Sequence, residues 1–325
     1  MRKILIVVAI FLGIASFGSA VIPASYPQGS ETKAPGLPPA CDRQCLYGFL
    51  DQYLHALLAR DPSRVHWAKM VRNSENNVSL QVGDGLWGTI TGFGSYDLRF
   101  ADAEAGQVGW YGIVQEKTFT SCMALRLKVE NGAISEAETI VRRADGSGPF
   151  PNPPVLEEKP VFNEILPPER RRPRERMISI ANGYFDTLQL NDGTLFTQFD
   201  DNCNRIENGL QTTHNPKLAE TIPVAALGCA DQFRLGHYRF DDRLRARRYP
   251  LVDEERGLVM AGAFLDHAGR LGTYKYTDGR VVESSMKTPS TLCVLELFKI
   301  QDGKIRQIEA VFISVPYNMP SPWVP

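Results

Sequence analysis

The sequence has almost no net charge, and it lacks several motifs that identify common classes of enzyme. Its 36 Lys and Arg residues balance 37 Asp and Glu residues, which leaves a net charge of −1. Without an excess of basic residues, the chain has no electrostatic signature for nucleic acid or for an anionic membrane. A G-x-S-x-G nucleophile elbow and a phosphate-binding loop are also missing. We therefore expect no nucleic-acid partner and no cofactor, so any catalysis would be acid–base chemistry by side chains.

Long hydrophobic runs are scarce as well. Residues 4–15 form an apolar run behind two basic residues, and the small residues 18–20 follow it. This pattern is typical of a signal peptide, here residues 1–20. The run is shorter than the ~20 residues that a transmembrane helix needs. Residues 21–40 follow as a proline-rich leader. We expect a secreted or periplasmic protein without a transmembrane segment.

Histidine and cysteine are infrequent, with 5 and 6 residues respectively. No pair of them has zinc-ligand spacing near a second pair, so we expect no metal site. Export would permit disulfides. Cys203 and Cys229 are the favoured pair, because they flank a loop rich in Thr, Asn and Pro. Cys41 and Cys45 could join each other or tie down the amino-terminal arm.

A segment from the middle of the chain returns near its end. Residues 126–141 (RLKVENGAISEAETIV) match residues 296–312 (ELFKIQDGKIRQIEAVF) at an offset of 171. Each copy contains Asn-Gly or Asp-Gly, the preferred two-residue turns of β-hairpins, and therefore predicts a hairpin. Cys122 and Cys293 lie at the same offset (293 − 122 = 171) within apolar strand patterns. We expect both to be buried free thiols.

A helix at the start of each half completes the repeat. Apolar residues at helical spacing surround Tyr53 in one half and Tyr184 in the other, at an offset of 131 (184 − 53). A helix followed by mostly antiparallel strands predicts an α+β architecture. The fold expectation is therefore one α+β layer per half, and the two halves are expected to pack on each other.

Prolines divide the chain between the halves. Residues 146–172 are proline-rich and predict an extended linker. We call residues 41–145 module one and residues 173–325 module two. Because the offset between matching residues grows from 131 to 171, module two carries about 40 extra residues. We expect this insertion around residues 210–256.

Several short motifs carry a resemblance to a known superfamily. Module one contains SENN, GDGLW and RLKVENGAISEAETIV, and module two contains CNRIENG, RRYPLVDEERG, FLDH and FKIQDGKIRQIEA. Together they resemble a tandem secreted branch of the nuclear transport factor 2-like superfamily. This superfamily includes SnoaL-like polyketide cyclases, ketosteroid isomerase and scytalone dehydratase. The resemblance implies two cone-shaped α+β barrels, each a curved antiparallel sheet with helices in its hollow, arranged as a pseudo-dimer. It also implies a small apolar organic ligand or substrate in the hollow.

Glu75 and Glu207 are the first candidates for catalysis. The resemblance places them near the general-base carboxylate of ketosteroid isomerase. A carboxylate in an apolar cavity has a raised pKa, which suits proton abstraction near neutral pH. The alternative is structural, with each glutamate capping backbone amides or pairing with Arg72 or Arg205.

Two tyrosines and one histidine complete the main set. The resemblance implies that Tyr53 and Tyr184 donate hydrogen bonds to a substrate carbonyl, although tyrosines on an apolar helix face also serve as packing. In QFRLGHYRF, alternation predicts a strand with His237 on the same face as Phe233 and Leu235. His237 would then face the hollow or be a satisfied core residue.

Asp266 and His267 end an apolar strand and form a further candidate pair. Histidine titrates near physiological pH, so the two residues could shuttle a proton. Neighbouring residues of a strand point to opposite faces, however, which favours a plain strand end over a shared site.

The leading hypothesis is a secreted lyase, dehydratase or isomerase that acts on a small apolar or aromatic molecule. Glu207 or Glu75 would abstract a proton, and Tyr184 or His237 would stabilise the resulting oxyanion. Module two is the expected active half because it carries the insertion. The alternative is a non-catalytic protein that binds a hydrophobic ligand or serves as a scaffold.

Overall fold

The structure, a computed structural model, describes residues 41–143, 150 and 156–324. All of these residues belong to one compact unit, Ala40–Pro325. The expected signal peptide and leader lie outside the described residues, as does part of the expected linker. Among the helices that are described, none has the length and apolar character to cross a membrane.

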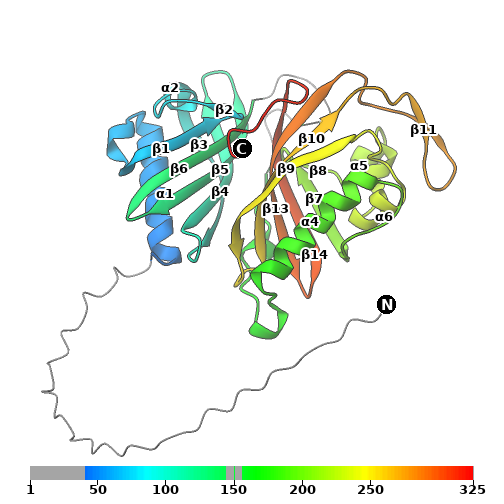
Figure 1. The fold of residues 1–325 in the computed structure, drawn as a ribbon, viewed down its shortest axis with the longest axis horizontal. Coiled ribbons are helices and arrows are strands. Elements are labelled where there is room, and N and C mark those ends of the chain that lie inside the picture. Colours follow the sequence, from blue (N-terminus) through cyan, green and yellow to red (C-terminus); the bar gives the residue numbers. More distant parts are fainter. Residues whose placement is uncertain (1–40, 144–149, 151–155, 325) are drawn as a thin grey trace, which may run out of the picture. The chain divides into compact units, whose positions relative to one another are not determined.

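Module one is a sheet with a long helix at its start (Figure 1). In chain order its elements are α1 (Arg43–Ala59), the 3₁₀ helix η1 (Pro62–Arg64), β1 (Trp67–Glu75), β2 (Val78–Ser79), α2 (Leu86–Thr89), β3 (Ile90–Asp102), β4 (Gln107–Glu116), β5 (Thr120–Glu130) and β6 (Ala133–Arg142). Two short helices then connect the modules, α3 (Pro160–Asn163) and η2 (Pro168–Arg170).

Module two repeats this order with additions. Its elements are α4 (Arg174–Leu190), β7 (Phe199–Glu207), β8 (Leu210–Gln211), α5 (Pro216–Ala219), η3 (Pro223–Ala226), α6 (Cys229–Arg234), β9 (Arg243–Asp253), β10 (Leu258–His267), β11 (Thr273–Lys275), β12 (Val281–Glu283), β13 (Ser290–Gln301) and β14 (Lys304–Val315).

The two modules share one sheet topology, which supports the repeat found in the sequence. The strand order is β2-β1-β6-β5-β4-β3 in module one and β8-β7-β14-β13-β10-β9 in module two. In each sheet one pair is parallel, β1 with β6 and β7 with β14, and the other pairs are antiparallel. The sheets are therefore mixed rather than purely antiparallel. Their observed pairings leave both sheets open, so the expected closed barrel is not shown.

The two expected hairpins are present. β5 and β6 turn at Asn131 and Gly132, and β13 and β14 turn at Asp302 and Gly303. All four residues have positive φ, between 52° and 80°. This is the backbone conformation that a type I′ turn requires and that Asn, Asp and Gly tolerate best.

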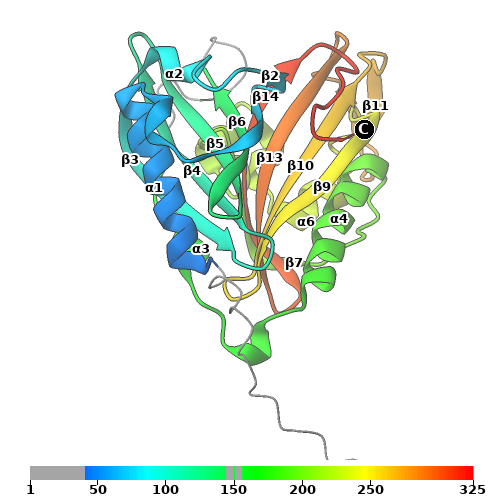
Figure 2. The ribbon, with the colours of Figure 1, turned by 60° about the vertical axis from the view of Figure 1, so that its left-hand side comes forward.

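Each long helix lies across one face of its own sheet (Figure 2). In α1 the buried positions include Leu46, Leu50 and Tyr53, which pack on the sheet with residues such as Trp110. The side chain of Asp42 caps the first turn by accepting from the Cys45 amide at 2.9 Å. α4 buries its equivalent face against the second sheet in the same way. We call the space between helix and sheet the hollow of each module.

The opposite faces of the two sheets pack together and form what we call the seam. Its core contains apolar residues of both modules, for example Tyr111 and Ile140 from one and Met260 and Leu295 from the other. The modules therefore pack on each other through their sheets, with a helix on the far side of each sheet (Figure 2). Sheet-on-sheet packing of this kind buries the second apolar face of each sheet.

Matched ion pairs cross the seam at one end. Arg43 of module one binds Asp253 of module two through both of its terminal nitrogens. Arg174 of module two binds Asp102 of module one, with 2.7 Å between Nη2 and Oδ1. The two arginines begin equivalent helices, and the two aspartates end equivalent strands. The contact is therefore reciprocal, as in the self-complementary interface of a symmetric dimer.

The additional length of module two is divided between two segments. The offset is 132 at β1/β7 (199 − 67), 151 at β4/β10 (258 − 107) and 171 at β6/β14 (304 − 133). Only the first extra segment, which contains α5, η3 and α6, falls in the expected range 210–256. The second contains the β11–β12 hairpin. Both segments share a small apolar cluster that includes Val224, Phe240, Tyr274 and Tyr276.

The strand expected for QFRLGHYRF is wrong, because these residues form the end of α6 and a series of turns. Cys229 opens the helix and is joined to Cys203 of β7, so the favoured disulfide is confirmed. Gly236 follows with φ of 72°, which turns the chain away from an extended path. His237 therefore lies in a turn over module two rather than in its sheet.

The remaining cysteines are settled by the structure. Cys41 and Cys45 form a second disulfide, so the first of their two alternatives holds. Cys122 and Cys293 are buried free thiols, as expected. Burial raises the pKa of each of these thiols to about 12, so neither is a reactive thiolate at neutral pH.

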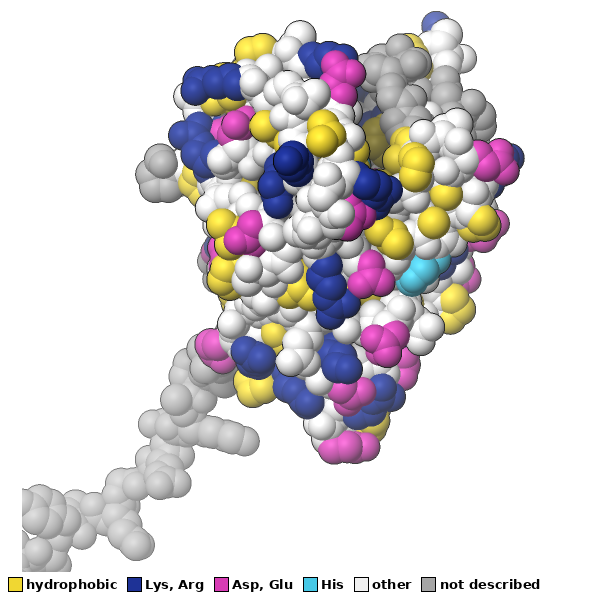
Figure 3. Space-filling view, turned by 90° about the vertical axis from the view of Figure 1, so that its right-hand side faces the viewer, with side chains coloured by type: hydrophobic (Ala, Val, Ile, Leu, Met, Phe, Trp, Pro, Cys, Tyr) yellow, Lys and Arg dark blue, Asp and Glu magenta, His cyan; other side chains and the backbone are white. Residues whose placement is uncertain are grey.

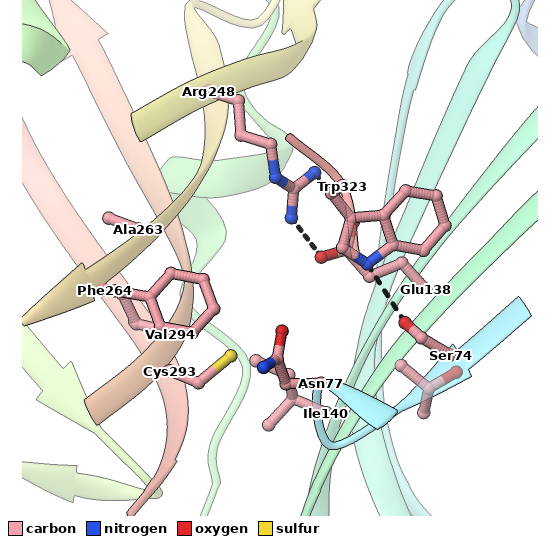
Figure 4. Close-up of a pocket in the computed structure, with 11 residues that line it drawn as sticks. Ser74, Asn77, Glu138, Ile140, Arg248, Ala263, Phe264, Cys293, Val294 and Trp323 are labelled. Atoms are coloured by element: carbon pink, nitrogen blue, oxygen red, sulfur yellow. Dashed lines mark hydrogen bonds and ion pairs between the residues drawn. The ribbon is translucent and has the colours of Figure 1, made fainter. Parts of the chain in front are cut away.

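The carboxyl-terminal residues return to module one. Asn77 donates to the carbonyl of Pro320 at 2.8 Å, and the indole of Trp323 donates to the hydroxyl of Ser74 at 3.0 Å (Figure 4). The guanidinium groups of Arg126 and Arg248 lie over the same indole ring, at 4.7 and 5.6 Å from its centroid. The tail thus fastens the two modules at one edge of the seam.

Candidate functional site

The hollow of module one contains a small cavity of about 10 Å³. Tyr53, Glu75, Trp87 and Thr139 are among the residues that line it. Two of the expected site residues, Tyr53 and Glu75, therefore lie around the same cavity. Its volume is sufficient for about one water molecule. Burial raises the pKa of Tyr53 to about 12, so its hydroxyl remains protonated and can donate a hydrogen bond.

Glu75 is held by two fixed partners. One carboxylate oxygen accepts from the Leu86 amide at 2.7 Å, and the other accepts from Arg143 Nη1 at 3.0 Å. Arg143 also binds Glu116. The structure thus shows the capping and pairing of the structural alternative, although with Arg143 in place of Arg72. Arg72 instead lies over the Trp323 ring, 5.4 Å from its centroid.

The glycines at positions 83, 85 and 88 have the spacing G-x-G-x-x-G, which is often linked to dinucleotides. That motif requires a βαβ unit with a parallel strand pair. Here the glycines join the two-residue strand β2, antiparallel to β1, to the four-residue helix α2. A Cβ on Gly85 would lie 2.4 Å from Oε2 of Glu75. The loop therefore accommodates the protein's own carboxylate rather than a pyrophosphate.

The hollow of module two contains a buried acid that the sequence analysis did not select, Glu296 of β13. Burial raises the pKa of Glu296 to about 8, although the neighbouring Arg205 and a hydrogen bond from Tyr184 act in the opposite direction. The Tyr184 ring is surrounded by Phe185, Phe199, Phe233 and Phe298. At pH 7 a carboxyl group with this pKa is therefore mostly protonated, and only a minor fraction is ionised.

Glu207, the second expected base, lies beside this group. It forms an ion pair with Arg205, which is buried. Arg205 also donates to the hydroxyl of Tyr238 at 2.6 Å and to Gln232 Oε1 at 3.2 Å. The guanidinium stacks on the rings of Phe233 and Tyr238, at 5.3 and 4.8 Å from their centroids. Glu207 thus neutralises Arg205, while Glu296 has no guanidinium of its own.

His237 is near this group but is not part of it. Its Nδ1 lies 2.8 Å from the hydroxyl of Tyr276, which belongs to the second extra segment. Burial and the charge of Arg205 lower the pKa of His237 to about 4. The ring is therefore neutral at physiological pH and joins the two extra segments.

Asp266 and His267 point to opposite faces of β10. Asp266 is fixed by Arg243, Arg245 and Thr291, whose hydroxyl is 2.6 Å from Oδ1. His267 is buried, with Nε2 at 2.6 Å from Oδ1 of Asp241. Burial raises the pKa of Asp241. The two candidates are thus separated by the sheet, as strand geometry requires.

The structure brings together Tyr184, Glu207 and Arg205 around Glu296. Asp266 lies on the other face of the sheet, whereas His267 binds Asp241, whose carboxyl group interacts electrostatically with Arg205 and Glu207. Glu296 could have been found by comparing the copies of the repeat, because its counterpart at the offset of 171 is Leu125. Val294 and Phe298, on either side of it, face the same apolar hollow. A charged residue among these apolar residues, where the other copy of the repeat has leucine, is the sequence signal that points to Glu296.

No group of His, Cys, Asp and Glu within the described ranges could hold a metal ion. On the face shown in Figure 3, basic and acidic side chains are interspersed over module two. Such a mixture provides no field of one sign for a polyanionic partner.

Residues 170–312 match a family described as a domain of unknown function, DUF8021. No curated protein matches the chain significantly. One similar solved structure is a candidate ketosteroid isomerase from Kribbella flavida, with 15% identity, a TM-score of 0.27, and coverage of 45% of this chain and 84% of that one. Another is a de novo designed protein with a curved β-sheet, with 14% identity, a TM-score of 0.26, and coverage of 31% and 88%.

Proposed function

We propose that module two catalyses proton transfer on a small apolar carbonyl compound without a cofactor, as an isomerase, lyase or dehydratase would. One observation carries the proposal, namely the buried carboxyl group of Glu296 in the hollow, at the position where module one has the apolar Leu125. Burying an ionisable group without a full counter-charge is unfavourable for folding. Perturbed carboxyl groups of this kind cluster at functional sites.

The neighbouring groups suit distinct roles. Glu296, with a pKa of about 8, can both accept and donate a proton near neutral pH. Tyr184 keeps its proton, because burial raises its pKa well above the ordinary value, and it can donate to a carbonyl oxygen. Arg205 supplies a positive charge close to the same point, which would stabilise an enolate. Glu207 holds Arg205 in place as a positioning residue.

A second function, binding without chemistry, is favoured by a different observation. Both glutamates expected as bases are bridged to arginines, Glu75 to Arg143 and Glu207 to Arg205. The cavity of module one has room for only about one water molecule, which suits packing better than turnover. On this alternative Glu296 would only select ligands that carry a hydrogen-bond donor or acceptor.

Deuterium exchange distinguishes the two functions. The full chain is incubated in D₂O with a panel of small cyclic β,γ- and α,β-unsaturated ketones, and mass spectrometry measures deuterium at the α-carbon. We expect catalysed exchange by the natural chain, and a loss of about 10²–10⁴-fold in Glu296→Gln. Tyr184→Phe should reduce the rate without abolishing it.

The control is Glu75→Gln, which removes the carboxylate of module one that matches Glu207. Its exchange rate should remain that of the natural chain. Exchange that is equal in the natural chain and in Glu296→Gln would eliminate the catalytic proposal. Saturable binding of a ketone without any exchange would favour the binding function.

A further inference from the structure

The seam contains two equivalent glutamates in different surroundings. Glu138 of β6 and Glu309 of β14 occupy matching positions of the repeat, 171 residues apart. Both are buried, with 5% and 1% of their surface exposed. Glu138 is bound by Arg126 of its own sheet and by Arg248 of the other module. The two guanidiniums outweigh burial and hold the pKa of Glu138 below its ordinary value.

Glu309 has neither arginine. In the strand register Glu138 lies opposite Arg126, whereas Glu309 lies opposite Leu297. From the other module, Glu309 receives only the hydroxyl of Tyr96 on the edge strand β3, at 2.6 Å from Oε2. Within the described part of the chain its second oxygen has no partner. Glu309 thus occupies the position that matches Glu138, but without the two arginines that bind Glu138.

Other buried polar atoms near Glu309 also have no partner among the described residues. They are the hydroxyl of Tyr111, which interacts electrostatically with Glu309, and Nε2 of Gln307, two residues earlier on β14. Both side chains are at least nine-tenths buried. Buried polar groups in native proteins are nearly always satisfied. The unpaired oxygen of Glu309 and the unpaired hydroxyl of Tyr111 therefore indicate a missing polar partner.

A groove of about 490 Å³ lies beside Tyr96, the residue whose hydroxyl binds Glu309. Tyr96, whose hydroxyl covers Glu309, forms part of its wall. The groove is acidic, because it contains three carboxylates and one ammonium group. These charged lining residues are Asp97, Glu157, Glu158 and Lys159.

We propose that the groove at Tyr96 binds a small organic cation with a planar guanidinium, which displaces the Tyr96 hydroxyl and pairs with Glu309. The chain itself supplies the precedent, since Arg126 and Arg248 make this contact at the matching glutamate. A guanidinium can bind both oxygens of a carboxylate at once, which an alkylammonium cannot. The acidic groove would attract a cation and repel an anion.

The proton on Glu309 competes with the ligand. Burial raises the pKa of Glu309 to about 7, although the hydrogen bond from Tyr96 and the charge of Lys159, which lines the groove, act against this. The other titratable groups that face it, Tyr111 and Cys122, stay neutral because burial raises the pKa of each. Of Glu309, Tyr111 and Cys122, only Glu309 therefore changes charge between pH 5.5 and 8. Binding should follow its ionised fraction, which changes roughly 30-fold over this range.

The test is a titration of the full chain with methylguanidinium chloride, with ethylammonium chloride as the comparison and sodium chloride to match ionic strength. Ligand-observed NMR and calorimetry at pH 8 and 5.5 provide the dissociation constants. We expect saturable binding of methylguanidinium at pH 8, weaker binding of ethylammonium, and roughly 30-fold weaker binding of methylguanidinium at pH 5.5.

Three variants locate the site. Glu309→Gln should weaken binding at least about tenfold at pH 8. Leu297→Arg should restore the internal guanidinium and also block binding. Glu220→Gln, an exposed carboxylate outside the groove, should bind as the natural chain does. Unchanged affinity in a folded Glu309→Gln variant would overturn the proposal, as would the absence of saturation up to about 50 mM.

Discussion

Glu296 and Glu309 illustrate how single residues set the pH response of this protein. Both carboxyl groups are buried, and burial raises both pKa values, to about 8 and about 7, from the ordinary value of 4.5. The folded state therefore holds protons that the unfolded chain has released. Their contribution to stability is fully present below pH 4.5 and is lost as pH rises through the folded-state pKa values.

The first prediction concerns the stability of the Glu296→Gln variant as a function of pH. Between pH 4.5 and 8 the natural chain should lose about 1.4 kcal/mol per pH unit from this group alone, and the variant should lack that slope. Urea unfolding at pH 5, 6.5 and 8 measures the difference. Parallel curves for the two proteins would show that Glu296 is not protonated in the folded state.

At the same scale, sequence reasoning found only part of the site. Tyr184 and Glu207 were selected from the resemblance, and both lie beside the buried acid. Glu296 was missed because a lone charge in an apolar strand has no periodic signal of its own. The pairing of Glu75 with Arg143 joins residues 68 positions apart, and no local pattern encodes it.

Among the elements, the parallel strand pairs depend on a repeated asparagine. Asn76 follows β1 and exchanges two hydrogen bonds with the backbone of Val141, at 2.8 and 3.1 Å. Asn208 follows β7 and does the same with Phe312, at 3.0 and 3.1 Å. Both have positive φ, 52° and 48°. The recurrence of Glu-Asn in both modules therefore reflects the structural role of the asparagine as well as that of the glutamate.

The second prediction follows from these contacts. Asn76→Ala and Asn208→Ala should each destabilise the protein by about 2–3 kcal/mol, because two backbone groups lose partners and alanine disfavours positive φ. Denaturant unfolding provides the measurement. Asn208→Gly, which tolerates the conformation but lacks the side chain, should lose less than Asn208→Ala. Equal losses would mean that backbone conformation has no part in the effect.

Elements with a local signal could be predicted, and those with a tertiary cause could not. The hairpins depend on Asn-Gly and Asp-Gly turns, and the helices on the spacing around Tyr53 and Tyr184, all of which lie within a short window. The end of α6 and the turns after it were mistaken for a strand, because a six-residue helix shows too little periodicity and its position depends on the disulfide to Cys203. The second extra segment was missed because an offset gives total length but not its distribution.

For the whole molecule, the reciprocal ion pairs indicate that the modules meet as the halves of a symmetric dimer would. Asp102 accepts from Arg174 and from the Val252 amide, and Asp253 accepts from Arg43 and from the Arg256 amide. Both aspartates are 2% exposed. Asp102 therefore binds a side chain and a backbone amide of the other module. Asp253 binds a side chain of the other module and a backbone amide of its own turn.

The third prediction tests this symmetry. Asp102→Ala and Asp253→Ala should each lower the free energy of unfolding by about 2–3 kcal/mol, because a charged partner and a backbone donor are left unpaired. Chemical denaturation measures both. Glu283→Ala, which removes an exposed ion pair to Lys287, is the control and should change stability by less than about 1 kcal/mol. A large effect at only one of the two buried sites would contradict reciprocity.

The carboxyl-terminal tail imposes an order in time on the assembly of this protein. Trp323 meets Ser74 across 249 positions of sequence. At ribosomal speeds of about 5–20 residues per second, roughly 12–50 s separate the synthesis of the two partners. During that interval the docking site of the indole on module one stays empty. A released chain truncated after Val315 would keep all strands of both sheets, and the edge that they share would lack the contacts of the tail.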